Sequence, residues 1–143
     1  MAHLIHSVLP NPRRPIIYID PKLSVIHCAN LMTSQNIGAL VVREGDQLLG
    51  MVTERDIVRT CIKPGLILSS MIARDVAYAD VSILSVDDPV EEAMAVITNT
   101  KRRHILVEEK GEIVALLSIG DLLLNMLDNN ARVIQHLENY IHN

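Results

Sequence analysis

Hydrophobic and polar positions follow one order of patterns in the first half of the chain. A short apolar segment at 16–20 comes first, and residues 25–32 then show the apolar spacing of a helix face. Two apolar runs follow on either side of a polar turn at 44–47, whose Gly45 suits the positive φ of a β-hairpin. A second helix is expected from about Thr53 through Cys61. The pattern predicts a β-α-β-β-α unit.

The second half repeats this order. Residues 37–42 align with 102–107, and 48–53 with 113–118, both at an offset of 65. The segment 76–80 resembles 16–20 only at an offset of 60, which predicts a first strand there and five inserted residues within 81–85. Conserved order at these offsets indicates a tandem duplication. One unit of about 50 residues has too little core to fold alone, so we expect the two to pack together.

These patterns divide the chain into three parts. We expect the first repeat with its N-terminal segment at 1–65, ending at a Pro64-Gly65 linker. The second repeat, with a short connecting helix at 69–74, should span 66–128, where its last helix ends. A tail at 129–143 carries Ala131, Ile134, Leu137 and Ile141 at spacings of three and four. This amphipathic helix is expected to cover the module or a partner subunit rather than enter a membrane.

Composition narrows the class of protein. The 143 residues are 49% hydrophobic without Phe or Trp, so the core must be aliphatic, and intrinsic disorder is excluded. A net charge of -4 and only three Tyr argue against a nucleic-acid-binding domain. The six His show no metal-ligand spacing, so no metal is expected. Two isolated Cys, the absence of a basic leader and the polar breaks within 23–42 favour a soluble cytoplasmic protein with no membrane span.

Candidate chemistry lies where each hairpin meets its second helix. Thr53 and Asp56, and likewise Ser118 and Asp121, match the Ser/Thr-x-x-Asp/Glu capping box that begins many helices. The same groups could also hold a ligand. Free N–H groups at a helix start suit a phosphate, and a carboxylate there can accept both hydroxyls of a ribose. Both interpretations remain open, and they are compatible.

The segments around these boxes resemble a known family. Gly50-Met51-Val52-Thr53-Glu54-Arg55-Asp56 is similar to the Gly-apolar-x-Thr/Ser-x-x-Asp signature of cystathionine-β-synthase (CBS) domains, and residues 115–121 resemble a second copy. The resemblance covers about 16–128 as a tandem pair, or Bateman module. It implies an α/β (α+β) fold of two β-α-β-β-α repeats packed by pseudo-twofold symmetry. Ala115 in place of the signature Gly, Leu106 in place of a frequent Pro, and the expected insertion depart from the pattern.

The resemblance also implies two composite adenosine sites. One would join Ser118 and Asp121 to Tyr18, Ile37, Gly38 and Ala39; the other would join Thr53, Arg55 and Asp56 to Tyr78, Arg102, Arg103 and His104. Leu116 and Gly120 of the second signature complete the expected set. The basic residues would meet phosphate, although a solvated strand end explains most such charge runs. The tyrosines could contact adenine or simply pack at a sheet edge.

The expected function is therefore regulation rather than catalysis. The ligand would be an adenine nucleotide such as AMP, ADP, ATP or NAD(H), whereas S-adenosylmethionine lacks the phosphate that the basic residues suit. Members of the family usually form homodimers, and binding would act on a target protein that the sequence does not identify. The alternative is a structural or interaction protein with vestigial sites, for which Ala115 and the 81–85 insertion would be symptoms.

Overall fold

The computed structural model describes residues 3–61, 65 and 68–142, and it divides into two compact units. One unit is Ile16–Val81, and the other combines the chain up to Pro15 with the chain from Ser82 onward. Each contains one of the two repeats. The linker position Pro64 and the side chains of Cys61 and Ile141 lie outside the described part.

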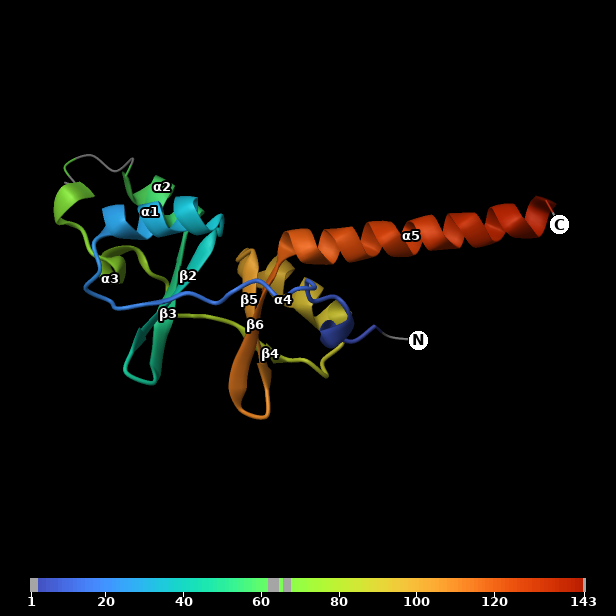
Figure 1. The fold of residues 1–143 in the computed structure, drawn as a ribbon, viewed down its shortest axis with the longest axis horizontal. Coiled ribbons are helices and arrows are strands. Elements are labelled where there is room, and N and C mark those ends of the chain that lie inside the picture. The colour runs from blue at the N-terminus through green and yellow to red at the C-terminus, as the bar shows by residue number, and fades with distance from the viewer. Residues whose placement is uncertain (1–2, 62–64, 66–67, 143) are drawn as a thin grey trace. The chain divides into compact units, whose positions relative to one another are not determined.

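The unit Ile16–Val81 contains a three-stranded sheet in the order β1-β2-β3 (Figure 1). Strand β1 is parallel to β2, and β2 is antiparallel to β3. Its elements are β1 (Tyr18–Ile19), α1 (Val25–Gln35), β2 (Ala39–Glu44), β3 (Gln47–Thr53), α2 (Glu54–Cys61), the 3-10 turn η2 (Leu68–Ser70) and α3 (Ala73–Val76). The β-α-β-β-α unit expected from the sequence is confirmed.

The second unit has the same sheet topology, in the order β4-β5-β6. Its elements are η1 (Ile5–Ser7), β4 (Ile83–Ser85), α4 (Val90–Thr100), β5 (His104–Glu109), β6 (Glu112–Ser118) and α5 (Ile119–His142). The helix α5 is continuous, so the break expected near Asp128 is wrong: no proline or glycine interrupts the chain there. No helix among the described residues is long and apolar enough to span a membrane.

Local sequence signals explain the boundaries of these elements. Ser24 accepts a hydrogen bond from the His27 amide and caps α1, and α1 ends where Asn36 adopts a left-handed conformation with φ 51°. Lys101, with φ 59°, ends α4 in the same way. The two hairpins turn at glycines with positive φ, Gly45 and Gly111. Before these turns, β2 is buried at its first four positions, 39–42, and β5 at 105–107, as an aliphatic core requires.

The first strand of the second repeat lies at 83–85, so the prediction of a strand at 76–80 is wrong. Tyr18 pairs with Val41, and Ile83 pairs with Leu106, which is again an offset of 65. No five-residue insertion is therefore needed within 81–85. Tyr78 pairs with Met51 of β3, in the unit of the first repeat, through two backbone hydrogen bonds of 3.0 Å. The apolar pattern at 76–80 indicated extended backbone but not its partner.

The connecting segment differs from the single short helix expected at 69–74: η2 and α3 flank Met71 and Ile72. This segment has a counterpart at the N-terminus that the sequence comparison missed. The Val25 amide donates to the Met71 carbonyl (3.0 Å), and the equivalent Val90 amide donates to the His3 carbonyl (2.8 Å). The bridge between Ser24 and Ile72 matches the one between Leu4 and Pro89. Each unit therefore contains one such short segment: 71–76 lies beside α1 in the first unit, and 3–8 lies beside α4 in the second.

The buried side chain of Ile5 shows that the N-terminal segment belongs to the fold of its unit. Ile5 is 0% exposed and Val8 is 7% exposed, and both join the core formed by α4, β5 and β6. The Ile5 amide also donates to the carbonyl of Asp88 at 2.9 Å. Residues 3–8 are thus fixed to the second repeat by both apolar packing and backbone hydrogen bonds.

Candidate functional site

Both capping boxes form at the starts of α2 and α5, as predicted. In the first, the Thr53 amide donates to Oδ2 of Asp56 at 3.2 Å, and the Asp56 amide donates to Oγ1 of Thr53 at 3.3 Å. In the second, the Ser118 amide donates to Oδ2 of Asp121 at 2.9 Å, and the Asp121 amide donates to Oγ of Ser118 at 3.2 Å. The carboxylates are therefore held in fixed orientations at two helix N-termini, where the helix dipole favours negative charge.

The structure brings each box together with the start of the hairpin of its own repeat. Ala39 pairs with Thr53 across β2 and β3, and the Glu54 amide donates to the Gly38 carbonyl at 3.2 Å. In the other unit His104 pairs with Ser118, and the Ile119 amide donates to the Arg103 carbonyl at 2.9 Å. The grouping of residues from different repeats around one ligand stays a prediction.

Several candidate residues have buried side chains. Ile37, Ala39 and Leu116 are 4%, 1% and 2% exposed, which makes them part of the core of their units. These positions can offer a ligand mainly backbone groups. Arg55 in α2 and Gly120 in α5 are exposed, next to the box carboxylates in sequence.

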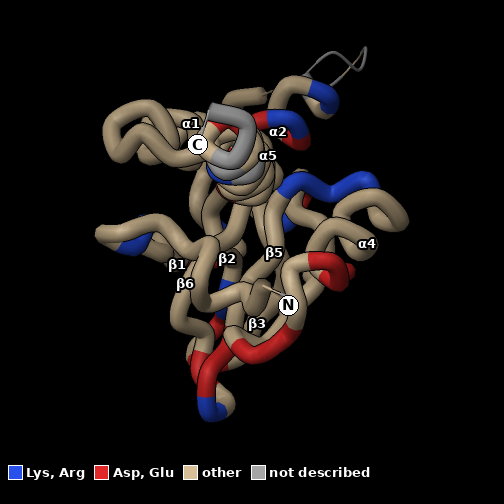
Figure 2. Tube along the Cα trace, turned by 90° about the vertical axis from the view of Figure 1, so that its right-hand side faces the viewer, with Lys and Arg blue, Asp and Glu red and all other residues tan. Residues whose placement is uncertain are grey.

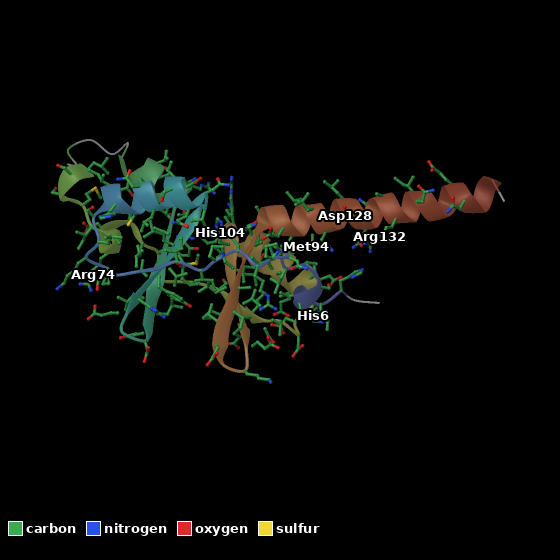
Figure 3. All side chains as sticks on the ribbon, in the orientation of Figure 1. His6, Arg74, Met94, His104, Asp128 and Arg132 are labelled. Atoms are coloured by element: carbon green, nitrogen blue, oxygen red, sulfur yellow. The ribbon has the colours of Figure 1, made fainter. Side chains whose placement is uncertain are left out.

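The basic residues between α4 and β5 form a short charged segment, blue in Figure 2. Arg103 is exposed, and Arg102 and His104 are half-buried. His104 begins β5 (Figure 3), opposite Ser118 in the strand register. The segment therefore lies beside the second capping box within one unit, at the edge of the sheet where β6 leads into α5.

The two tyrosines occupy different settings, because Tyr78 is not the counterpart of Tyr18. The Tyr18 ring is half-buried, and the guanidinium carbon of Arg43 lies 3.7 Å from its centroid, within cation–π range. Tyr78 is 8% exposed, and its hydroxyl contacts Sδ of Met51 at 3.6 Å. Contact of adenine with the Tyr78 ring would require that ring to leave its packed position.

The departure at Ala115 has a packing explanation. A Cβ placed on Gly50 would overlap the backbone carbonyl of Tyr78, which pairs with the neighbouring Met51. Glycine is therefore required at position 50 by the approach of another backbone segment. The equivalent Ala115 is 2% exposed and packs in the core of the other unit, where a methyl group is accommodated.

Arg14 is a residue of this region that the sequence analysis missed. Its guanidinium forks onto Asp121, with Nη2 to Oδ1 at 2.8 Å and Nη1 to Oδ2 at 3.2 Å. The side chain of Asp121 is 8% exposed and that of Arg14 is 32% exposed. A basic pair before the first strand was the only available signal, and nothing in the sequence linked it to a carboxylate 107 positions away.

The described residues favour neither a metal site nor a reactive thiol at Cys28. Within the described ranges, no three His, Cys, Asp or Glu side chains gather in a way that could hold a metal ion. Cys28 is a buried free thiol, and burial raises its pKa, which disfavours the reactive thiolate.

Fold and boxes together define a tandem pair of β-α-β-β-α repeats, each with a Ser/Thr-x-x-Asp box. The model of the CBS domain family matches residues 5–63 and 73–128, and the chain belongs to this family. The CBS-domain pair is a regulatory module, as the resemblance in the sequence implied.

Relatives and solved structures with CBS domains are similar to this chain in sequence or fold. A CBS domain-containing protein, CBSX3, mitochondrial, from Arabidopsis thaliana is 32% identical over 82% of this chain, and the chain covers 60% of its length. A putative signal-transduction protein with CBS domains from Burkholderia ambifaria superposes with a TM-score of 0.81 at 29% identity, covering 88% of this chain and 95% of the other. The CBS domain pair of protein MJ0100, in complex with 5-methylthioadenosine and S-adenosyl-L-methionine, shares the fold at 16% identity with a TM-score of 0.76, covering 90% and 99%.

Proposed function

We propose that the chain binds an adenine nucleotide, AMP, ADP, ATP or NAD(H), and transmits its binding to a target protein. The observation that carries this proposal is the pair of carboxylates, Asp56 and Asp121, each fixed in a capping box at a helix start. A carboxylate in this position can accept the two hydroxyls of a ribose. That MJ0100 was solved with two adenosine-containing compounds supports the same ligand class for this fold.

The basic residues Arg102, Arg103 and His104 support a phosphorylated ligand. Arg102 and Arg103 can donate paired N–H groups to phosphate oxygens, and the adjacent His104 lies opposite Ser118 in the strand register. S-adenosylmethionine has a sulfonium cation and a carboxylate but no phosphate, so these groups suit it less well than they suit a nucleotide. We therefore propose that the phosphate is required for tight binding.

The interpretation as a vestigial module loses its two supports. The absence of the signature glycine at Ala115 follows from packing, because only Gly50 faces the Tyr78 carbonyl. The insertion at 81–85 is not present, since β1 and β4 share the offset of 65. Both repeats retain the complete box, which favours function over decay.

We also propose that the chain forms a homodimer through its helices. An apolar groove between α4 and α5 is lined by Met94, Ile97, Thr98, Ile119, Leu122, Leu123 and Met126. Along α5, Leu127, Ile134 and Leu137 are 64%, 56% and 57% exposed, and they add apolar surface along the same helix. A second copy would cover this face.

The buried free thiol of Cys28 suits a reducing compartment, and we propose that the protein is cytoplasmic.

A thermal-shift screen with AMP, ADP, ATP, NAD(H), adenosine and S-adenosylmethionine tests the proposed ligand class. A nucleotide at 100 times its dissociation constant should stabilise the folded protein by about 2.7 kcal/mol. Asp56→Asn and Asp121→Asn should each reduce the shift, because each removes one charged ribose acceptor while the asparagine Oδ1 can still accept from the Thr53 or Ser118 amide. No shift with any nucleotide, for protein shown to be folded, would refute the proposal.

A further inference from the structure

The ion pair between Arg14 and Asp121 engages the carboxylate that the proposed function assigns to ribose. Both oxygens of Asp121 take part: Oδ1 accepts from Arg14 Nη2, and Oδ2 accepts from Arg14 Nη1 and from the Ser118 amide. With its side chain only 8% exposed, Asp121 is covered largely by protein. A ribose that donates two hydroxyls to these oxygens therefore competes with the guanidinium.

Arg14 is held close to this carboxylate by the segment that precedes it. Ile5 and Val8 are buried in the core of the same unit, so the chain is anchored six positions before Arg14. Pro10 and Pro12 lie between Val8 and Arg14, and their fixed φ reduces the number of conformations available to this linking segment. A guanidinium that leaves Asp121 consequently stays near it instead of moving freely into solvent.

We propose that Arg14 is a specificity residue of the Asp121 site, which makes binding depend on a phosphate; this inference rests on the proposed nucleotide-binding function. An uncharged nucleoside must break the two charge-assisted hydrogen bonds between Arg14 and Asp121, and it offers the guanidinium nothing in return. A nucleotide offers phosphate oxygens, which match the same planar fork. The phosphate thus replaces the lost carboxylate as the partner of Arg14.

The test compares adenosine with AMP in a chain that carries Asp56→Asn, so that binding at the Asp121 site dominates. Isothermal titration gives both dissociation constants with Arg14 intact and with Arg14→Gln. Arg13→Gln is the matched control, because Arg13 is adjacent and exposed, and its substitution changes the net charge equally. Circular dichroism and urea unfolding confirm that each variant is folded.

Arg14→Gln should bind adenosine about tenfold more tightly, since the competing guanidinium is gone, and AMP no more tightly than before. The preference for AMP over adenosine should fall at least tenfold, which corresponds to about 1.4 kcal/mol, whereas Arg13→Gln should retain it. Raising the salt concentration should also improve adenosine binding to the chain with Arg14 intact, because salt weakens a partly exposed ion pair.

The possible results distinguish a failure of the role proposed for Arg14 from a failure of the proposed nucleotide binding. If AMP binds but Arg14→Gln leaves the preference within twofold of its value with Arg14 intact, the role of Arg14 is refuted and nucleotide binding stands. If Arg14→Gln weakens adenosine binding, Arg14 is a ligand contact rather than a competitor, and the inference is again refuted. If neither adenosine nor AMP binds to any folded variant, or to the folded wild-type chain, the proposed function fails and the inference with it.

Discussion

Replacing Gly50 with alanine should destabilise the first repeat, because the new Cβ would overlap the carbonyl of Tyr78. Relief requires the segment around Tyr78 to move away from β3. That movement weakens two backbone hydrogen bonds with Met51, each worth about 0.5–1.5 kcal/mol. It also partly exposes the Tyr78 ring, whose full burial would contribute about 1.5–3 kcal/mol. The lower chain entropy of alanine in the unfolded state offsets about 0.4–1 kcal/mol. The expected net loss is about 2–4 kcal/mol.

Urea unfolding followed by circular dichroism measures this loss as a lower midpoint at an unchanged slope. Hydrogen exchange supplies the local readout, because the amides of Met51 and Tyr78 should lose protection together. The matched control is Ala115→Gly in the second repeat, which should cost only about 1–2 kcal/mol from backbone entropy and one lost methyl group. A Gly50→Ala protein within 0.5 kcal/mol of wild type, with both amides still protected, would refute the packing explanation of this glycine.

Other substitutions test the packing and the charges of the two units. Ile5→Ala should reduce the free energy of unfolding by about 2–4 kcal/mol, because Ile5 is fully buried, whereas Ile26→Ala, 44% exposed, should cost under about 1 kcal/mol in the same urea assay. A double-mutant cycle of Arg14→Gln and Asp121→Asn should give a coupling of about 1 kcal/mol that decreases with salt; a coupling of zero at low salt would contradict the ion pair. Burial raises the pKa of the Cys28 thiol, so the folded state favours the neutral form, and stability should be lost as pH rises above the ordinary thiol value of about 8.5. Cys28→Val should lessen that alkaline loss in pH-dependent urea unfolding, and an identical pH profile would count against it.

The sequence predicted the elements whose signals are local. The hairpins follow from polar turns with Gly45 and Gly111, and the capping boxes follow from a fixed three-residue spacing. The placement of Tyr78 could not be predicted in this way. Its segment has the alternation of a first strand, but its hydrogen-bond partner, Met51, lies 27 positions earlier. An apolar pattern specifies an extended backbone without specifying which sheet it joins.

The role of the N-terminal segment could not be predicted for a related reason. Segments 3–8 and 71–76 share a role but little sequence, because what the fold demands there is two buried apolar positions, Ile5 and Val8 or Ala73 and Val76, and backbone hydrogen bonds. Backbone bonds leave almost no trace in side-chain identity. The pairing of Arg14 with Asp121 was hidden in the same way, since long-range ion pairs have no characteristic spacing.

We expect the two capping-box carboxylates, Asp56 and Asp121, to bind the ribose of an adenine nucleotide. Isothermal titration of AMP and ATP into the wild-type chain and into the Asp56→Asn, Asp121→Asn double variant tests it most directly. At least one nucleotide should bind saturably to the wild-type chain, and its binding should weaken at least tenfold in the folded double variant, which corresponds to about 1.4 kcal/mol. Equal affinity in both proteins, or no binding to folded wild-type protein, would contradict it.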